Sequence, residues 1–228
     1  MNACQDQEGR ITKIEKRKVT LRAPIPFNLG DLQREAYRVF RFSPGYTLSV
    51  AEKLYLAALI SYPRTSSQKL PSSVNYKKVI SGLSKFGGTY TNLAATLLRR
   101  DHISPNEGSK TDPAHPAIYP TGEKPQSKVE AAEAKLFDLT IRRFLATFGD
   151  SAISQHTTVT ILVKDEHVFT AEGKKILYEG WMYFYRPYTS DIGTDLPQLH
   201  EGDVLRNVVV RMEKKFTQPP QDTIKIAY

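Results

Sequence analysis

The order in which two hydrophobic periods follow one another is the feature that most constrains the fold of this chain. Residues 10–22 alternate β-branched and charged side chains, which predicts one or two half-exposed strands. Apolar residues then recur at helical spacing until Gly149, after which the period returns to two. The order of short β, long α and then β indicates an α+β protein with a helical domain inserted into a β-rich domain. Two domains in series are the alternative.

Two helices are predicted in the first half of the helical part. Apolar residues at helical spacing predict one helix over residues 29–40 and another over residues 48–60, the latter capped by Thr47 or Ser49. The Pro-Gly sequence within residues 42–46 predicts a turn between them. Two helices joined in this way are compatible with a helix-turn-helix or winged-helix arrangement, and an ordinary helical hairpin is the alternative.

The second half of the chain changes from loops to a long helix and then to strands. Residues 87–125 are rich in Gly, Thr, Asn, Pro and Ser, so loops are expected there. Residues 128–148 carry an apolar stripe that predicts a helix, capped by Ser127 and ended by Gly149. The strands predicted after it are 157–163, 168–170, 176–178 and 204–211, with Gly173 among the turn residues.

Positive charge is concentrated in the first hundred residues. The formal net charge of the chain is +8, and residues 29–100 hold eleven Lys and Arg against three acidic residues. A concentrated basic surface attracts polyanions such as nucleic acids. A solvated surface without a partner is the alternative, and charge alone does not separate the two.

Composition excludes several other classes of protein. Cys4 is the only cysteine, which excludes an internal disulfide framework and a CxxC zinc site. No apolar run approaches the roughly 20 residues that span a bilayer, so no membrane segment is expected. Residues 1–6 lack the basic and apolar stretches of a secretory signal. We therefore expect a cytoplasmic protein.

The sequence Tyr62-Pro63-Arg64 places a phenol close to a guanidinium. Pro63 disfavours a helical conformation for Tyr62, so the preceding helix should stop there. Arg64, two positions further on, can point to the same side of an extended segment. A phenolate can attack a phosphodiester while a guanidinium stabilises charge on the phosphoryl oxygens. A surface turn with its ring packed on a helix end is the alternative.

A second candidate is the stretch 112–121, in which prolines stiffen a loop around His115. A histidine can contact a phosphate or transfer a proton near neutral pH, and a loop histidine with a backbone partner is the alternative. The sequence contains no Gly-rich phosphate loop, HExxH motif or Asp-x-Asp pair. Trp181 is expected in the core or on a sheet surface, with base stacking as the alternative.

Four segments of the chain resemble landmarks of the type IA DNA topoisomerases and occur in that family's order. Residues 51–71, which contain Tyr62 and Arg64, closely resemble the active-site segment in the form typical of archaeal enzymes and reverse gyrases. Residues 27–33 resemble the entry to the tyrosine-bearing domain, and residues 114–121 resemble the histidine loop. The fourth landmark resembles the return of the chain through the gate domain and consists of residues 178–181, 196–197, 202–203 and 216–220.

The resemblance implies a reaction and a set of residues for it. Tyr62 would attack one strand of single-stranded DNA and remain linked to its 5′ phosphate until the strand is resealed, without a nucleotide cofactor. Arg64 would stabilise the scissile phosphate, and His115 would assist through contact with DNA. The further DNA contacts implied are Gln33, Thr65, Ser66, Ser67, Lys69 and Thr121.

The resemblance also implies a four-part toroid, to which this chain would contribute two parts. A helical, winged-helix-like domain that carries the tyrosine, residues 28–150, would be inserted in a β-rich gate domain. The first segment of that gate domain would be residues 1–27, and the return segment would be residues 151–228.

Three departures from the family pattern bear on activity. No segment resembles the TOPRIM domain, which in the family supplies acidic residues and binds Mg²⁺. A TOPRIM-bearing chain is therefore an expected partner. This chain itself is expected to bind no metal. Thr65-Ser66-Ser67 replaces the Thr-Asp-Ser of bacterial members and removes a carboxylate beside Tyr62. Residues 221–228 do not match the expected continuation. A catalytically incomplete module that binds single-stranded DNA is therefore the alternative function.

Overall fold

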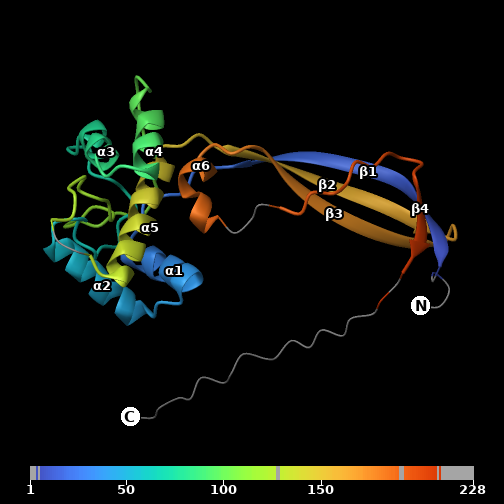
Figure 1. Cartoon of the computed structure of the whole chain (residues 1–228), viewed down its shortest axis with the longest axis horizontal. Coiled ribbons are helices and arrows are strands. Elements are labelled where there is room, and N and C mark those ends of the chain that lie inside the picture. The colour runs from blue at the N-terminus through green and yellow to red at the C-terminus, as the bar shows by residue number, and fades with distance from the viewer. Residues whose placement is uncertain (1–3, 5, 127–128, 190–192, 210, 212–228) are drawn as a thin grey trace, which may run out of the picture. The chain divides into compact units, whose positions relative to one another are not determined.

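The chain divides into two compact units. The computed structural model, shown in Figure 1, describes residues 4, 6–126, 129–189, 193–209 and 211. The helical unit comprises residues 17–156 and 174–195. The strand unit comprises the described residues of 1–16, 157–173 and 196–228. The predicted landmark at residues 216–220 and the unmatched residues 221–228 lie outside the described residues.

Four strands of the described residues form one sheet in the order β3-β2-β1-β4. They are β1 (Gln7–Leu21), β2 (Ala152–Val163), β3 (His167–Tyr178) and β4 (Val204–Val208). Strands β1 and β4 pair antiparallel, with Gly9 opposite Leu205. A helical part inserted into a β-rich domain requires the N-terminal strand to share a sheet with the strands after Gly149, and it does.

The predicted turn at Gly173 is wrong. This glycine is buried inside β3, which continues from His167 to Tyr178 as one strand where two short strands are predicted. Glycine inside a strand costs only about 0.5–1 kcal/mol relative to alanine. Continuous pairing of the residues on either side outweighs that cost.

The helices of the described residues all lie in the helical unit. They are α1 (Leu29–Phe40), α2 (Pro44–Leu56), α3 (Tyr76–Ser84), α4 (Thr89–Leu98), α5 (Ala131–Thr147), α6 (Met182–Tyr185) and the 3₁₀ turn η2 (Arg186–Tyr188). Helix α1 has the predicted bounds. It begins where the Asn28 side chain accepts a hydrogen bond from the backbone N–H of Asp31, at 2.7 Å.

Helix α2 begins and ends earlier than predicted. Ser43 caps it, and Pro44 occupies the first turn, where a fixed φ and a missing N–H cost nothing. The caps predicted at Thr47 and Ser49 are therefore wrong. The helix also ends at Leu56 and does not reach Tyr62, because Ala58 adopts a left-handed conformation with φ of 58°. Tyr62 thus lies in a loop that α2 leads into.

Two further helices lie in regions where none is predicted. Helix α3 has no counterpart in the sequence prediction, and α4 contradicts the loop predicted for the start of residues 87–125. The polar residues of α4 conceal three buried apolar ones, Leu93, Ala94 and Leu97, which face the core at helical spacing. Residues 99–125 contain no helix, as predicted.

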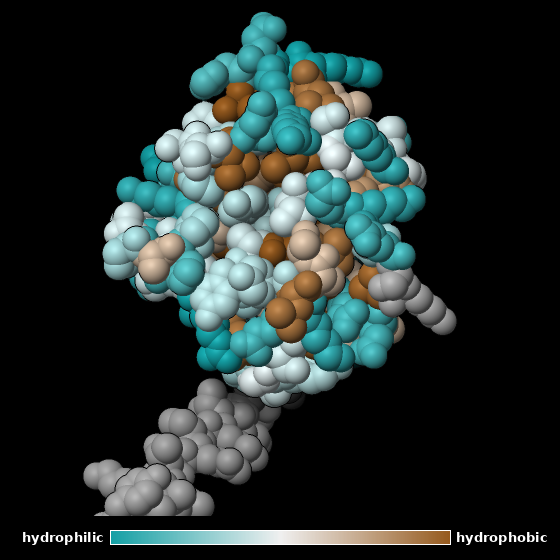
Figure 2. Space-filling view, turned by 90° about the vertical axis from the view of Figure 1, so that its left-hand side faces the viewer, coloured by the Kyte–Doolittle hydropathy of each residue, from teal (hydrophilic) through white to brown (hydrophobic). Residues whose placement is uncertain are grey.

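Helix α5 is the centre of the buried core. Ten of its residues are buried, and it contacts α1, α2, α4 and α6. It is capped by Glu130, which forms a capping box with Glu133, whereas the predicted cap Ser127 lies outside the described residues. Hydrophilic residues cover most of the face of the helical unit seen in Figure 2, with hydrophobic residues in small separate groups.

Trp181 packs against this core, which confirms the structural interpretation of its sequence position. Its indole Nε1 donates to the carbonyl of Leu21 at 3.0 Å, and the ring is half-buried. A side chain at Gly149 would place its Cβ 2.5 Å from the Cα of Trp181. Glycine at position 149 therefore allows the end of α5 to approach the residues that follow β3.

Candidate active site

The tyrosine-bearing segment, residues 57–70, is held against the histidine-bearing loop by short antiparallel pairing. The backbone N–H of Ser61 donates to the carbonyl of Tyr119 at 2.9 Å, and the Ser61 hydroxyl accepts from the N–H of Tyr119 at 3.0 Å. Two positions further along, the N–H of Thr121 donates to the carbonyl of Leu59 at 3.0 Å. Both segments are thus fixed at the backbone.

The segment that leads into α1 joins the same cluster. The carbonyl of Phe27 accepts from the N–H of Ile118 at 2.7 Å, and the N–H of Leu29 donates to the carbonyl of Thr65 at 3.0 Å. Three landmarks that lie far apart in the sequence therefore meet at one place in the helical unit. The fourth, at residues 178–181, packs elsewhere in that unit.

Tyr62 lies between two other aromatic rings. The centroid of its ring is 4.6 Å from that of His115, with the rings tilted by 50°. On another side, the ring of Tyr55 is 5.3 Å away and nearly perpendicular. Tyr62 and His115 are half-buried, so part of each side chain is open to solvent. The two residues that the sequence proposes for phosphate chemistry are in direct contact.

Arg64 is engaged by a carboxylate that the sequence interpretation does not mention. Its guanidinium binds Glu52 of α2, with an Nη2–Oε1 distance of 2.6 Å. The Arg64 side chain is 53% exposed, and an ion pair so open to water contributes only about 0–1 kcal/mol. A phosphate can therefore compete with Glu52 for this guanidinium. Glu52 lies twelve residues earlier, and only the fold reveals the pair.

Two of the predicted DNA contacts are committed to holding the site together. Thr65 and Ser67 are both buried. The Thr65 hydroxyl donates to the carbonyl of His115 at 3.1 Å and accepts from the N–H of Ser67 at 3.0 Å. The exposed residue of this triplet is Ser66. A DNA contact at Thr65 or Ser67 stays a prediction.

The remaining predicted DNA contacts lie on different segments. The side chain of Gln33 donates to the carbonyl of Pro44 at 3.1 Å. The hydroxyl of Thr121 donates to the carbonyl of Ala58 at 2.8 Å. Lys69 is exposed, and its side chain extends from the tyrosine-bearing segment. Among the predicted DNA contacts, Lys69 is therefore the one that presents a flexible, positively charged side chain at the surface.

Asp112 is a site residue that the sequence analysis did not select. One carboxylate oxygen accepts from the N–H groups of Ala114 and His115, at 3.0 and 3.1 Å. The other accepts from both the N–H and the hydroxyl of Ser66, each at 3.1 Å. An Asp side chain in a loop commonly accepts hydrogen bonds from backbone N–H groups two or three residues further on. The sequence alone could therefore have indicated the bonds from Ala114 and His115 to Asp112. The bonds to Ser66 depend on tertiary structure.

These bonds to Asp112 predict an acid-dependent loss of stability. Hydrogen bonds from the N–H groups of Ala114, Ser66 and His115 lower the pKa of Asp112 from 3.8 to about 2. As the pH falls, the Asp112 carboxylate is therefore protonated in the unfolded chain before it is protonated in the folded chain. The stabilisation is complete above about pH 4 and disappears as the pH falls toward 2. We expect the difference in melting temperature between the native chain and Asp112→Asn to shrink over that range. A difference independent of pH would contradict the assignment.

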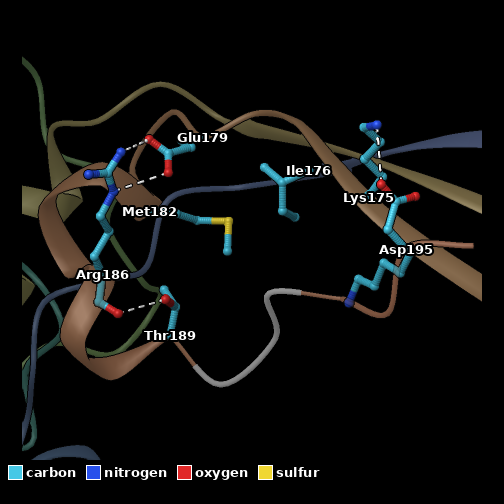
Figure 3. A pocket seen from close by; sticks show the side chains of 8 residues that line it. Lys175, Ile176, Glu179, Met182, Arg186, Thr189 and Asp195 are labelled. Atoms are coloured by element: carbon cyan, nitrogen blue, oxygen red, sulfur yellow. Dashed lines mark hydrogen bonds and ion pairs between the residues drawn. The ribbon is translucent and has the colours of Figure 1, made fainter.

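A pocket lined by two ion pairs lies away from this site, at the end of β3. The pocket in Figure 3 has a volume of about 400 Å³, and Met182 and Ile176 lie between two ion pairs. Arg186 pairs with Glu179, and Lys175 pairs with Asp195 at 3.2 Å. The pocket contains none of the residues that the sequence selects for phosphate chemistry.

The described part of the chain offers no metal centre. No three His, Cys, Asp or Glu side chains among its residues gather as a metal ion would require. The residues present here therefore do not fit the Mg²⁺ of the family resemblance. A separate property of the same residues is that no helix among them is both long and apolar enough to cross a membrane.

A family model described as DNA topoisomerase matches residues 1–224. The chain therefore belongs to the type IA DNA topoisomerase family.

Individual relatives agree with this assignment. The chain is 42% identical to DNA topoisomerase 1 of Pyrococcus horikoshii over 212 residues, which are 92% of this chain and 31% of that protein. It is 40% identical to DNA topoisomerase 1 of Methanothermobacter thermautotrophicus, over 96% of this chain and 30% of that protein. This chain thus spans about a third of the relatives that it matches.

A solved structure shares the fold. The full-length topoisomerase I of Thermotoga maritima superposes on 93% of this chain with a TM-score of 0.68, and 35% of that protein is covered. The sequence identity is 23%, so this likeness concerns the fold alone. It agrees with the α+β architecture described above.

Proposed function

We propose that this chain is the strand-cleaving and resealing part of a type IA DNA topoisomerase. The observation that carries the proposal is the contact between the rings of Tyr62 and His115, at 4.6 Å, in a cluster built from three distant landmarks. The substrate would be single-stranded DNA, as the resemblance to the type IA family implies.

In the proposed reaction, the phenolate oxygen of Tyr62 attacks a backbone phosphorus. A tyrosine–phosphate bond forms, and the bond from phosphorus to the 3′ oxygen breaks. The phenol proton is lost, and the departing 3′ oxygen gains a proton. Attack by the same 3′ hydroxyl reverses both bond changes and reseals the strand. No water or nucleotide is consumed, so the chemistry is energetically close to neutral.

Arg64 and His115 would serve the phosphate in different ways. Exchange of Glu52 for a phosphate oxygen would place the Arg64 guanidinium against negative charge that grows as the phenolate attacks. His115, in contact with the ring of Tyr62, would bind the DNA backbone and orient the scissile phosphate. The basic segment 29–100 would supply the longer-range attraction for the strand.

We further propose that the domain boundaries and partners follow the family resemblance. The helical, winged-helix-like tyrosine domain would be residues 28–150, inserted in a gate domain made of residues 1–27 and 151–228. A TOPRIM domain would act on the same phosphate and would hold Mg²⁺ through its own acidic residues. The described residues of this chain would not bind the ion.

A trapping experiment tests the proposal. The chain is mixed with a TOPRIM-bearing chain, Mg²⁺ and a single-stranded oligonucleotide, and the reaction is stopped with denaturant. With a label at the 3′ end of the oligonucleotide, we expect the label to become linked to this chain, because the 5′-phosphate fragment carries that end. A label at the 5′ end should not transfer. Salt-dependent binding with no covalent product in any combination would instead support the non-cleaving binding module.

The Glu52–Arg64 pair predicts a variant with increased affinity for DNA. Glu52→Gln removes the carboxylate that competes with phosphate for Arg64. We expect binding of a single-stranded oligonucleotide to tighten by about 2- to 5-fold at low salt, which is the range of an exposed ion pair. Fluorescence anisotropy measures the change, with Glu172→Gln in β3 as a control for the loss of one negative charge. Equal effects in the two variants would show that Glu52 does not restrain Arg64.

A further inference from the structure

The carboxylate of Asp112 joins the two segments that carry the proposed chemistry. Asp112 belongs to the histidine-bearing loop, and one of its oxygens closes a turn within that loop through the N–H groups of Ala114 and His115. Its other oxygen leaves the loop and binds Ser66 of the tyrosine-bearing segment twice. The two oxygens thus have separate tasks.

His115 is consequently held from both sides. Its backbone N–H donates to Asp112, and its carbonyl accepts from the hydroxyl of Thr65 at 3.1 Å. Thr65 fixes the His115 backbone directly to the segment that carries Tyr62. Asp112 fixes it to the same segment through Ser66. The backbone pairing of Ser61 with Tyr119 joins the two segments four residues away, and these two anchors act at His115 itself, which sits on a loop without a helix or strand of its own. The distance between the two rings therefore depends on them.

An amide at position 112 would not replace this link. Ser66 stands where bacterial members of the family carry Asp, and here a carboxylate from another segment lies 3.1 Å from its N–H and its hydroxyl. An amide at position 112 could still accept from the loop N–H groups, but its NH₂ group would face the N–H of Ser66. A carboxylate is therefore required for all four bonds.

We infer that Asp112 is a positioning residue, which holds the ring of His115 against Tyr62 by binding the tyrosine-bearing segment to the histidine-bearing loop. The inference rests on the proposed function for its consequence in catalysis. Its structural part concerns the free chain alone. Because the pKa of Asp112 is about 2, the carboxylate stays ionised at any pH near neutrality, and its four bonds persist there.

Nuclear magnetic resonance of the 228-residue chain tests the structural part. The neighbouring ring of Tyr62 should shift the imidazole proton signals of His115 away from those of a free histidine. In Asp112→Asn we expect these signals to move toward the free values, while other histidine signals stay in place. Ser66→Ala removes one of the two hydrogen bonds between Ser66 and Asp112 and should move the same signals in the same direction by less. Asp195→Asn, which alters a carboxylate of the Figure 3 pocket, is the control.

Unchanged His115 signals in both Asp112→Asn and Ser66→Ala would overturn the inference. If Asp112→Asn does not fold, Ser66→Ala decides alone, since it leaves the turn within the histidine-bearing loop intact. A matching change in the Asp195→Asn control would also overturn it, because the effect would then not be local.

The trapping experiment tests the consequence. With the TOPRIM-bearing chain and Mg²⁺, we expect Asp112→Asn to form the covalent product about 10- to 100-fold more slowly, as a misplaced catalytic group does. Oligonucleotide affinity should stay within about 2-fold, which separates positioning from binding. A normal rate in Asp112→Asn would overturn the catalytic part of the inference. If the native chain itself forms no product, the proposed function fails, and the resonance experiment still decides whether Asp112 holds His115.

Discussion

Replacement of Phe27 by alanine is expected to lower the free energy of unfolding by about 3–5 kcal/mol. The Phe27 side chain is fully buried, and its carbonyl binds Ile118 of the histidine-bearing loop. The guanidinium of Arg143 lies over the ring, 4.3 Å from its centroid. Alanine would leave a cavity at the point where α5 supports the site, and it would remove one of the partners of that guanidinium.

The matched control is Phe169→Ala, in which the same atoms are removed from a ring that is 37% exposed. Its cost should be well under half of that at Phe27, because less apolar surface and no enclosed cavity are involved. Urea unfolding followed by fluorescence and circular dichroism measures both variants. Similar losses at the two positions, or a loss under about 1 kcal/mol at Phe27, would contradict the role given to this core.

The second large effect is expected at the nucleophile. Tyr62→Phe removes a single oxygen, so the ring contacts with His115 and Tyr55 should persist, together with the fold and the affinity for DNA. The covalent product should nevertheless fall by at least about 10⁴-fold, since no other group in the variant occupies the position of the phenol oxygen.

Tyr55→Phe provides a matched control in the same aromatic group. Tyr55 is 41% exposed and lies against Tyr62, so its phenol is also accessible to DNA. We expect Tyr55→Phe to form the covalent product at close to the native rate. Loss of the product in Tyr55→Phe, with retention in Tyr62→Phe, would show that the nucleophile is Tyr55 and would contradict the assignment to Tyr62.

The fold class could be predicted from the sequence because its signals are periodic and long. The stripe of residues 128–148 covers all of helix α5, and the alternation in residues 10–22 covers most of strand β1. The return of the two-residue period after Gly149 places the later strands in the same sheet as the first. The spacing of apolar residues indicates which face of each helix or strand is buried, and therefore which type of element it is.

Errors arose where a local residue type was ambiguous. Gly173 has the composition of a turn but lies in a strand, and the polar residues of α4 conceal its apolar face. The start of α2 at Pro44 follows from the geometry of its first turn and not from apolar spacing. For Gly173 and α4, packing with a distant segment decided the structure, and a local pattern does not contain that information.

The candidate site shows the same division. Tyr62, Arg64 and His115 could be selected because their chemistry suits a phosphate and their segments resemble family landmarks. Glu52 and Asp112 could not, because each acts through a partner on another segment. A carboxylate twelve residues before an arginine, or forty-six after a serine, has no local signature. Its role depends on the loops that bring the two together.

The most direct test of the account is to identify the amino acid that carries the DNA. The covalent product from the trapping experiment is digested with protease and nuclease, and the peptide that retains a nucleotide is sequenced by mass spectrometry. We predict a single modified peptide, from residues 57–70, with the phosphate on the phenol oxygen of Tyr62 and the nucleotide attached through its 5′ oxygen. A nucleotide on any other residue of this chain, or a linkage through the 3′ oxygen, would contradict the account.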